Sequence, residues 1–301
     1  MTDNVIKSNS FKITNDQLGV LVNAVSQKST VAALSSNHPM QFGDTNLVVF
    51  NGAPKAEFVG EGQQKSPTPA SYTTVTAVPR KAQVTVRLTN EVEWMDEARA
   101  GELADTIINQ ASASLAEALD YGVLYRLNPL TGTAVSGWDN YLNATTNRVN
   151  ATTSPDADIR GAVKALLKAS PNVSVNGLAL SRSEAFELGN ERDKNGQLLH
   201  PEVGFGDVDG AKPFGLNYAV SETINPQGIT GTPNVLGVVG DFANGIYWGV
   251  QREIPIERID MGDPDGLGDL KRMNQVAYRA EIVYAWYVFP ERFAVIDAAK
   301  A

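Results

Sequence analysis

The side chains that most often carry covalent or acid–base chemistry are scarce in this sequence. It contains two histidines, His38 and His200, and no cysteine. A Ser/His/Asp triad would have to use one of these histidines, and the G-x-S-x-G turn that presents a nucleophilic serine is absent. A zinc-binding helix needs two histidines four residues apart, and a thiolate nucleophile needs cysteine. We therefore expect packed or surface histidines, no catalytic residues, and a protein that is not an enzyme.

Two glycine-rich segments raise the question of nucleotide or metal binding. Residues 204–210 miss the G-x-G-x-x-G spacing by one position, and no Walker A lysine motif is present. Residues 262–269 read Gly-Asp-Pro-Asp-Gly-Leu-Gly-Asp, which hints at a calcium loop. An EF-hand loop starting at Asp263 would need glutamate at its twelfth position, where this chain has Asn274. The sequence predicts a solvated turn there, with no metal and no cofactor.

Carboxylates and aromatic side chains gather in two further places, and each group has a structural explanation. Paired carboxylates can do acid–base work, but negative charge at the start of a helix is also what the helix dipole favours. Alternating aromatic residues are far more typical of strand packing or a subunit interface than of a ligand cage. We favour the structural explanation for both. The carboxylates are Glu91, Glu93, Asp96, Glu97 and Glu102, and the aromatic residues are Tyr278, Tyr284, Trp286, Tyr287, Phe289 and Phe293.

A long helix and the strands before it dominate the chain. Apolar residues recur every four positions from Leu103 to Val123, and Asn128-Pro129 supplies a stop, so about 30 helical residues spanning roughly 45 Å are predicted. Residues 46–89 read as strands, with apolar residues alternating at 84–88, interrupted by glycine and proline over a long polar tip. Neither part can bury itself alone, which favours contact with neighbouring subunits over a pocket.

The remaining elements mix helices with antiparallel strands without regular alternation, so the predicted class is α+β. Residues 1–40 read as an extended polar arm, and Asn195-Gly196 is a hairpin turn signal. A second helix is expected to be capped by Asp156 or Asp158. The predicted helices are 159–169 and 183–188, and the predicted strands are 173–180, 235–239, 246–250 and 276–288.

Charge and hydropathy exclude several kinds of protein. The net charge of −9 argues against a general nucleic-acid binder, because nonspecific affinity comes from neutralising phosphates with Lys and Arg. The same charge suits a surface that faces packed nucleic acid without adhering to it, or serves solubility alone. No apolar run is long enough for a membrane span, and the first 13 residues lack the apolar core of a signal peptide.

Five segments of the sequence together resemble the major capsid proteins of tailed bacteriophages, which share the Hong Kong 97-type fold. None is decisive alone, but their order and spacing are specific. The segments are 56–62 leading through Tyr72 to Glu91, the helix end at 116–122, residues 193–199 followed by 214–221, residues 239–242 with the strand to Ile259, and residues 279–281 through Ile296.

The resemblance implies an α+β capsid fold with an N-terminal arm, an extended β-hairpin loop, a long spine helix, and peripheral and axial domains. Arm, loop and helix are what a chain needs when its neighbours complete its fold. The implied division is 1–44 N-terminal arm, 45–88 extended loop, 89–129 peripheral domain with the spine helix, 130–245 axial domain, 246–277 return strands of the peripheral domain, and 278–301 C-terminal axial strand.

The function implied by the resemblance is self-assembly into hexamers and pentamers that close into an icosahedral shell around a double-stranded DNA genome. The expected partners are further copies of the chain, a separate scaffolding protein, a portal protein and a decoration protein. The DNA would be held without sequence-specific binding, and no membrane is involved. The protein would be made in the host bacterial cytoplasm and reside in the virion. The alternative is an encapsulin-type shell of a bacterial nanocompartment, which shares the fold and encloses cargo enzymes.

Some relatives also join neighbouring subunits covalently, lysine to asparagine, with a glutamate assisting. Lys55, Lys65 and Lys81 in the extended loop, together with Asn274 and Glu281, resemble that set. A desolvated lysine beside a carboxylate base could attack an amide carbonyl. Ordinary polar contacts at an interface explain the same residues without chemistry, and we favour them.

Overall fold

The computed structural model describes residues 29–50, 56–65, 72–91, 97–170, 172–203, 212–226 and 234–298. Helices and strands are mixed without regular alternation, as the sequence predicts. The strands are not all antiparallel, because residues 295–297 pair in parallel with 148–150, and residues 177–180 with 217–220. The helices are α2 (Thr30–Leu34), α3 (Glu97–Tyr125), α4 (Pro155–Ala169), α5 (Arg182–Asn190) and α6 (Phe242–Gly245), with short 3-10 turns at Leu142–Ala144, Pro213–Gly215 and Pro290–Arg292.

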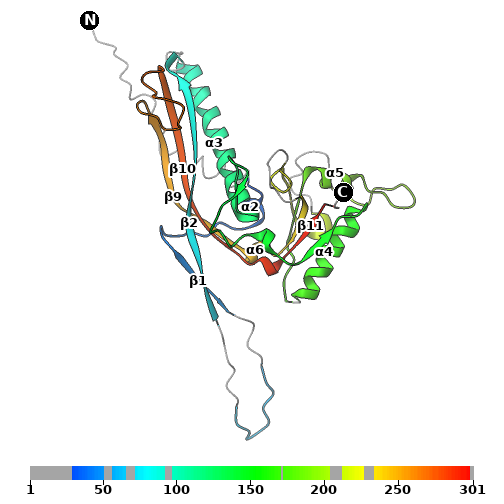
Figure 1. Ribbon diagram of the computed structural model, residues 1–301. Helices are drawn as coiled ribbons and strands as arrows, with labels where there is room; N and C mark the ends of the chain where they lie inside the picture. Colours follow the sequence, from blue (N-terminus) through cyan, green and yellow to red (C-terminus); the bar gives the residue numbers. More distant parts are fainter. Residues whose placement is uncertain are drawn as a thin grey trace.

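A four-stranded antiparallel sheet forms the long part of the molecule, in the order β1-β2-β10-β9. Strand β2 changes partner along its length, because residues 72–77 pair with β1 whereas residues 78–89 pair with β10. Helix α3 runs along one face of this sheet, and β1 with the first part of β2 projects away from the body as a hairpin (Figure 1). The strands are β1 (Thr45–Phe50), β2 (Tyr72–Thr89), β9 (Ile246–Ile259) and β10 (Gln275–Val288).

A five-stranded sheet forms the second part of the molecule, in the order β5-β11-β8-β6-β7. Ile159, Ala162 and Leu166 of α4 are buried in one core with Leu178 of β6 and Ile296 of β11. The strands are β5 (Arg148–Asn150), β6 (Gly177–Leu180), β7 (Asn217–Val220), β8 (Val235–Gly240) and β11 (Phe293–Asp297), and a small pair, β3 (Leu127–Asn128) and β4 (Thr133–Ala134), follows α3.

One hydrophobic core continues from the long sheet into the second. Leu115 and Leu119 of α3 share a buried cluster with Tyr284 of β10 and with Val295 of β11. The Tyr284 hydroxyl donates to the Leu115 carbonyl at 3.2 Å, which fixes the height of α3 against the sheet. The four-residue apolar period of the sequence therefore marks the buried side of this helix. The helix itself ends at Tyr125, earlier than Asn128-Pro129, and Arg126 takes a positive φ of 54°.

Gly122 lies where α3 meets Trp286, and it tests how closely the two elements pack. A Cβ at Gly122 would lie 2.6 Å from Cη2 of Trp286, whereas one at Gly161 of α4 would be 3.7 Å from its nearest neighbour. We expect Gly122→Ala to lower the free energy of unfolding by about 1–3 kcal/mol through overpacking. Gly161→Ala should raise it by about 0.5–1 kcal/mol. Urea denaturation measures both, and a fully stable Gly122→Ala would contradict the tight contact.

Several local predictions need correction. Helix α4 is capped by the Ser154 hydroxyl, which accepts from Ala157 N at 3.3 Å, and not by Asp156 or Asp158. Pro155 at the first helical position explains the choice, because its fixed φ sets the start of the helix one residue after Ser154. Pro79, expected in the irregular tip, lies inside β2 beyond the residues that pair with β1. At Pro79, β2 pairs with β10 on one side only, and its other side is a sheet edge. Proline is tolerated at an edge because no strand there needs its missing N–H.

Two of the predicted domain boundaries fall inside strands. A division at residue 278 would cut β10, which stays in the four-stranded sheet up to Val288; the chain enters the second sheet only after Pro290–Arg292. Residues 78–88, assigned to the extended loop, pair with β10 and belong to the same sheet. The division into domains stays a proposal. Residues 1–28 of the predicted arm and the glycine-rich segment 204–210 lie outside the described residues.

Candidate assembly surfaces

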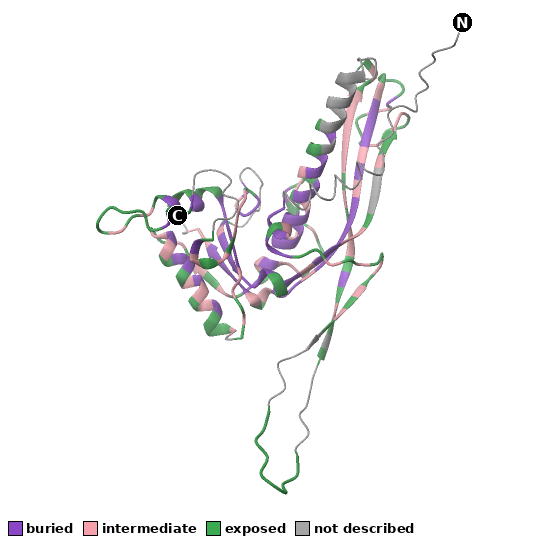
Figure 2. Cartoon of the chain, turned by 180° about the vertical axis from the view of Figure 1, so that it is seen from behind, coloured by how far each residue is buried: buried purple, intermediate pink, exposed green. Residues whose placement is uncertain are grey.

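The tip of the hairpin, residues 56–65, is an exposed segment. Residues 56–65 are all exposed, Phe58 completely so (Figure 2). A turn closes the tip, where Gln63 N donates to the Gly60 carbonyl at 3.1 Å and Gly62 takes a positive φ of 76°. Burying a phenylalanine side chain is worth about 1.5–3 kcal/mol, and this chain leaves that free energy unused. The tip therefore has the character of a contact surface.

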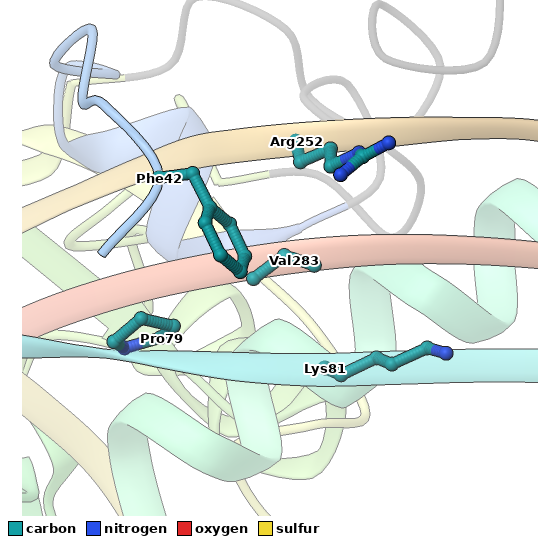
Figure 3. A pocket seen from close by; sticks show the side chains of 5 residues that line it. All are labelled: Phe42, Pro79, Lys81, Arg252 and Val283. Carbon is teal, nitrogen blue, oxygen red and sulfur yellow. The ribbon is translucent and has the colours of Figure 1, made fainter.

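A hollow of about 280 Å³ lies on the face of the long sheet opposite α3 (Figure 3). Pro79 and Lys81 come from β2, Val283 from β10 and Arg252 from β9, while Phe42 reaches over from the segment before β1. The Phe42 ring points down toward Val283 and Pro79, and the Lys81 and Arg252 side chains extend along the strands. The hollow thus combines an apolar floor with two cations.

The segment that carries Phe42 is tied to the sheet by a pair of hydrogen bonds. Gln251 Nε2 donates to the Gly43 carbonyl at 2.7 Å, and Gly43 N donates back to Gln251 Oε1 at 3.2 Å. Two bonds between one side-chain amide and the backbone of one residue fix both position and direction. Phe42, itself two-thirds exposed, is thereby held over the strands as part of the wall.

The aspartate-rich loop 262–270 is largely exposed, as expected of a solvated turn, and it folds around Arg87 of β2. The Arg87 guanidinium pairs with Asp265 and, at 3.4 Å, with Asp263, and it donates to the Gly268 carbonyl at 3.0 Å. This pairing lowers the pKa of Asp265. Arg279 adds a 2.8 Å bond to the Pro264 carbonyl. The loop is thus fastened to the end of the sheet.

Asp120 joins the start of the described chain to α3, and sequence reasoning missed it. Its carboxyl oxygens accept from Ser29 Oγ at 2.5 Å, Thr30 N at 2.9 Å, Val31 N at 3.1 Å and Thr223 Oγ1 at 2.8 Å. The side chain is fully buried, which raises the pKa of Asp120, while these bonds act in the opposite direction. The signal was present in the sequence, as a lone charge in the otherwise uncharged run 119–125.

The residues of the hypothetical cross-link are only partly brought together. Lys81 Nζ lies 2.7 Å from the Glu281 carboxylate of the same chain. Asn274 lies just before β10, seven residues from Glu281 and so about 23 Å away along the strand. Its side-chain amide donates to Glu91 at 2.8 Å. Lys65 is exposed near the tip, and Lys55 lies outside the described residues. A link between neighbouring copies stays a prediction.

The other residues singled out in the sequence have structural surroundings. His38 stacks on Tyr247 at 5.1 Å, and the buried His200 lies 2.9 Å from Asp156 and packs on Phe214. The aromatic residues of β10 are largely buried, and Phe293 packs edge-on against Phe242 in the core. Of the carboxylates before α3, Glu91 binds Asn274, whereas the side chains of the other four are not described.

Glu184 of α5 predicts a pH dependence of folding. Its side chain is buried beside Asp158, Glu187 and Glu191, and burial followed by these charges raises its pKa from 4.5 to about 7. The folded protein therefore keeps a proton that the unfolded chain releases, so this contribution is present below pH 4.5 and is lost as pH rises to 7. Stability should fall by up to about 3 kcal/mol over that window.

Glu184→Gln is the matched control, because it keeps the size of the side chain and cannot ionise. Urea denaturation between pH 4.5 and 7.5 should show a flatter stability profile for this variant than for wild type. Identical slopes for the two proteins would contradict the assignment to Glu184.

Comparison with known proteins shows which solved structures share this architecture. No family model and no curated protein matches the sequence. Among solved structures, the capsid of a native GTA particle has a TM-score of 0.58 over 100% of this chain and 95% of that chain, at 13% identity, which shows the fold alone. A phage capsid structure from Mycobacterium phage Ogopogo is 39% identical, with a TM-score of 0.78, over 90% of this chain and 92% of that chain. The chain belongs to the bacteriophage capsid protein family.

A structure from Gordonia phage Cozz is 25% identical to this capsid protein, with a TM-score of 0.76. The match covers 91% of this capsid protein and 87% of the Cozz chain. The family resemblance read from the five sequence segments is therefore confirmed. In the described part of the capsid protein, no helix has the length and apolar character needed to cross a bilayer.

Proposed function

We propose that this protein is the major capsid protein of a tailed bacteriophage, assembling as hexamers and pentamers into the icosahedral shell that encloses the double-stranded DNA genome. Family membership supports the capsid role. The observation that carries the proposal is the β1–β2 hairpin, whose tip is exposed, Phe58 completely so. A chain of this shape is completed by its neighbours.

In this proposal the β1–β2 hairpin is the extended loop, α3 is the spine helix, the long sheet with α3 is the peripheral domain, and the five-stranded sheet is the axial domain. Residues 1–44 are the arm, and the Asp120 bonds fasten its residues Ser29 and Thr30 to the spine helix. The hairpin tip contacts a different surface on the next copy, a head-to-tail contact that closes into rings when the rotation is right.

The net charge of −9 is consistent with a shell that encloses DNA without sequence-specific binding. The further partners of such a shell are a separate scaffolding protein, a portal protein and a decoration protein. The protein would then be located in the virion. The same family membership supports a role in structure rather than catalysis.

Electron microscopy of the purified, self-associated protein tests the proposal. We expect closed particles with five-fold and six-fold capsomers, and particles from infected cells should contain DNA and a portal vertex. Particles filled with cargo protein would favour the encapsulin-type alternative. A protein that stays monomeric at high concentration, with or without a scaffold, would overturn the capsid role.

A further inference from the structure

The tip of the hairpin has a specific chemistry. Its sequence from residue 57 is Glu-Phe-Val-Gly-Glu, so an apolar pair, Phe58 and Val59, is flanked by Glu57 and Glu61. Phe58 is completely exposed and Val59 is exposed. An aromatic anchor beside negative charge fits a site with an apolar floor and positive edges.

The hollow beside Phe42 has the complementary character. Pro79, Val283 and the Phe42 ring form its apolar part, and Lys81 and Arg252 form its charged edge (Figure 3). Its volume of about 280 Å³ lies just below the range of roughly 300–1,000 Å³ typical of pockets for drug-sized ligands, so it suits one aromatic side chain. Lys81 already pairs with Glu281. Arg252 is exposed at the other edge of the hollow and is the cation that we assign to the contact.

The tip of a chain lies away from the hollow of the same chain. Pro79 and Lys81 lie in β2 beyond the point where pairing with β1 ends, and the hairpin runs from there away from the body (Figure 1). The stretch from Pro79 to Tyr72 alone spans about 23 Å at 3.3 Å per residue, and the tip lies further out. The pairing of residues 45–50 with 72–77 holds the base of the hairpin in this direction. We therefore assign the aromatic side chain to another copy.

We propose that Phe58 of one copy inserts between Phe42, Pro79 and Val283 of a second copy, with Glu61 meeting Arg252 across the contact. This inference rests on the proposed function and names the surfaces through which copies join. Each copy then contributes one tip and one hollow, so the contact is head-to-tail and continues from copy to copy. The neighbour covers Phe58 and neutralises Arg252.

The absence of cysteine permits a direct test in the full-length protein. Val59→Cys combined with Gln41→Cys keeps Phe58, Glu61, Arg252 and the hollow floor, because Gln41 is exposed beside Phe42. A short bismaleimide added to assembled particles should give multimers beyond dimer on denaturing gels. Val59→Cys combined with Leu130→Cys is the control, because Leu130 is 91% exposed on the β3–β4 turn, outside the hollow. It should give no such series. Particles that form from the first pair without multimers would overturn the docking and leave the capsid role intact.

A second measurement uses no cysteine. Phe58→Ala should raise the protein concentration needed for assembly at least tenfold, whereas Leu130→Ala should assemble as wild type. Folding of the free subunit is not at stake, because Phe58 is completely exposed. Equal assembly of Phe58→Ala and wild type would overturn the proposal, while failure of wild type to assemble at all would instead count against the capsid role.

Discussion

Removing residues 56–65 and joining their ends through a short Gly-Ser turn should leave a folded, soluble protein that no longer closes into shells. The segment is exposed throughout and lies outside the buried clusters, so its loss should leave the free energy of unfolding within about 0.5 kcal/mol of wild type. Assembly should fail because the contact surface at the end of the hairpin is gone. Sedimentation and electron microscopy measure assembly, and urea denaturation measures folding.

The size of the deletion decides what it tests. A larger cut, from 55 to 80, would also remove residues 78–80, which pair with β10, and so damage the sheet itself. A variant with residues 56–65 replaced by ten residues of Gly and Ser keeps the length of the loop. It is the matched control that separates the loss of loop length from the loss of the tip side chains. It should also fail to close, since the side chains of the tip make the contact. Normal shells from either variant would remove the role given to the tip.

Asp120→Ala should be among the most damaging single substitutions in the protein. It leaves the Thr30 and Val31 amides and the Ser29 and Thr223 hydroxyls without their acceptor in a site closed to water. An unsatisfied buried donor costs about 1–3 kcal/mol, so we expect a loss of at least about 3 kcal/mol in the free energy of unfolding. Urea denaturation measures it.

The same substitution should release the chain at residue 29 from α3. Limited proteolysis should then cut near residues 29–31 faster in Asp120→Ala than in wild type. Asp120→Asn is the matched variant, because its amide keeps one acceptor oxygen. Its stability and its resistance to protease should lie between those of Asp120→Ala and wild type. Glu117→Ala, an exposed change on the same helix, should have little effect. An Asp120→Ala protein as stable and as resistant as wild type would contradict the described contact.

Patterns carried by neighbouring residues predicted much of the fold. The four-residue apolar period marked the buried side of α3, and alternation marked β2 and β10, because each of these signals lies within one element. The Ser154-Pro155 start of α4 is also a local signal, but the prediction chose the aspartates that follow as the cap. Asp156 pairs with Arg160 and His200, and Asp158 accepts from Thr152.

Contacts between distant residues could not be read in the same way. Arg87 and Asp265 are 178 positions apart, and Asp120 lies 90 positions from Thr30, so no spacing rule connects them. The aspartate-rich loop therefore showed a cluster of negative charge in the sequence, but nothing in the sequence identified Arg87 as its partner. The hollow is assembled from β2, β9, β10 and the segment before β1, and only the sheet register brings those together.

Strand β2 is one continuous element that serves the hairpin at one end and the long sheet at the other. A pull on the tip along the strand would load the hydrogen bonds between β2 and β10 in shear, all together, instead of peeling them apart one by one. Rupture then requires many bonds to fail at once. A lattice of such chains would resist stretching far better than any single contact in it, and mechanical toughness would come from the way the strand is shared.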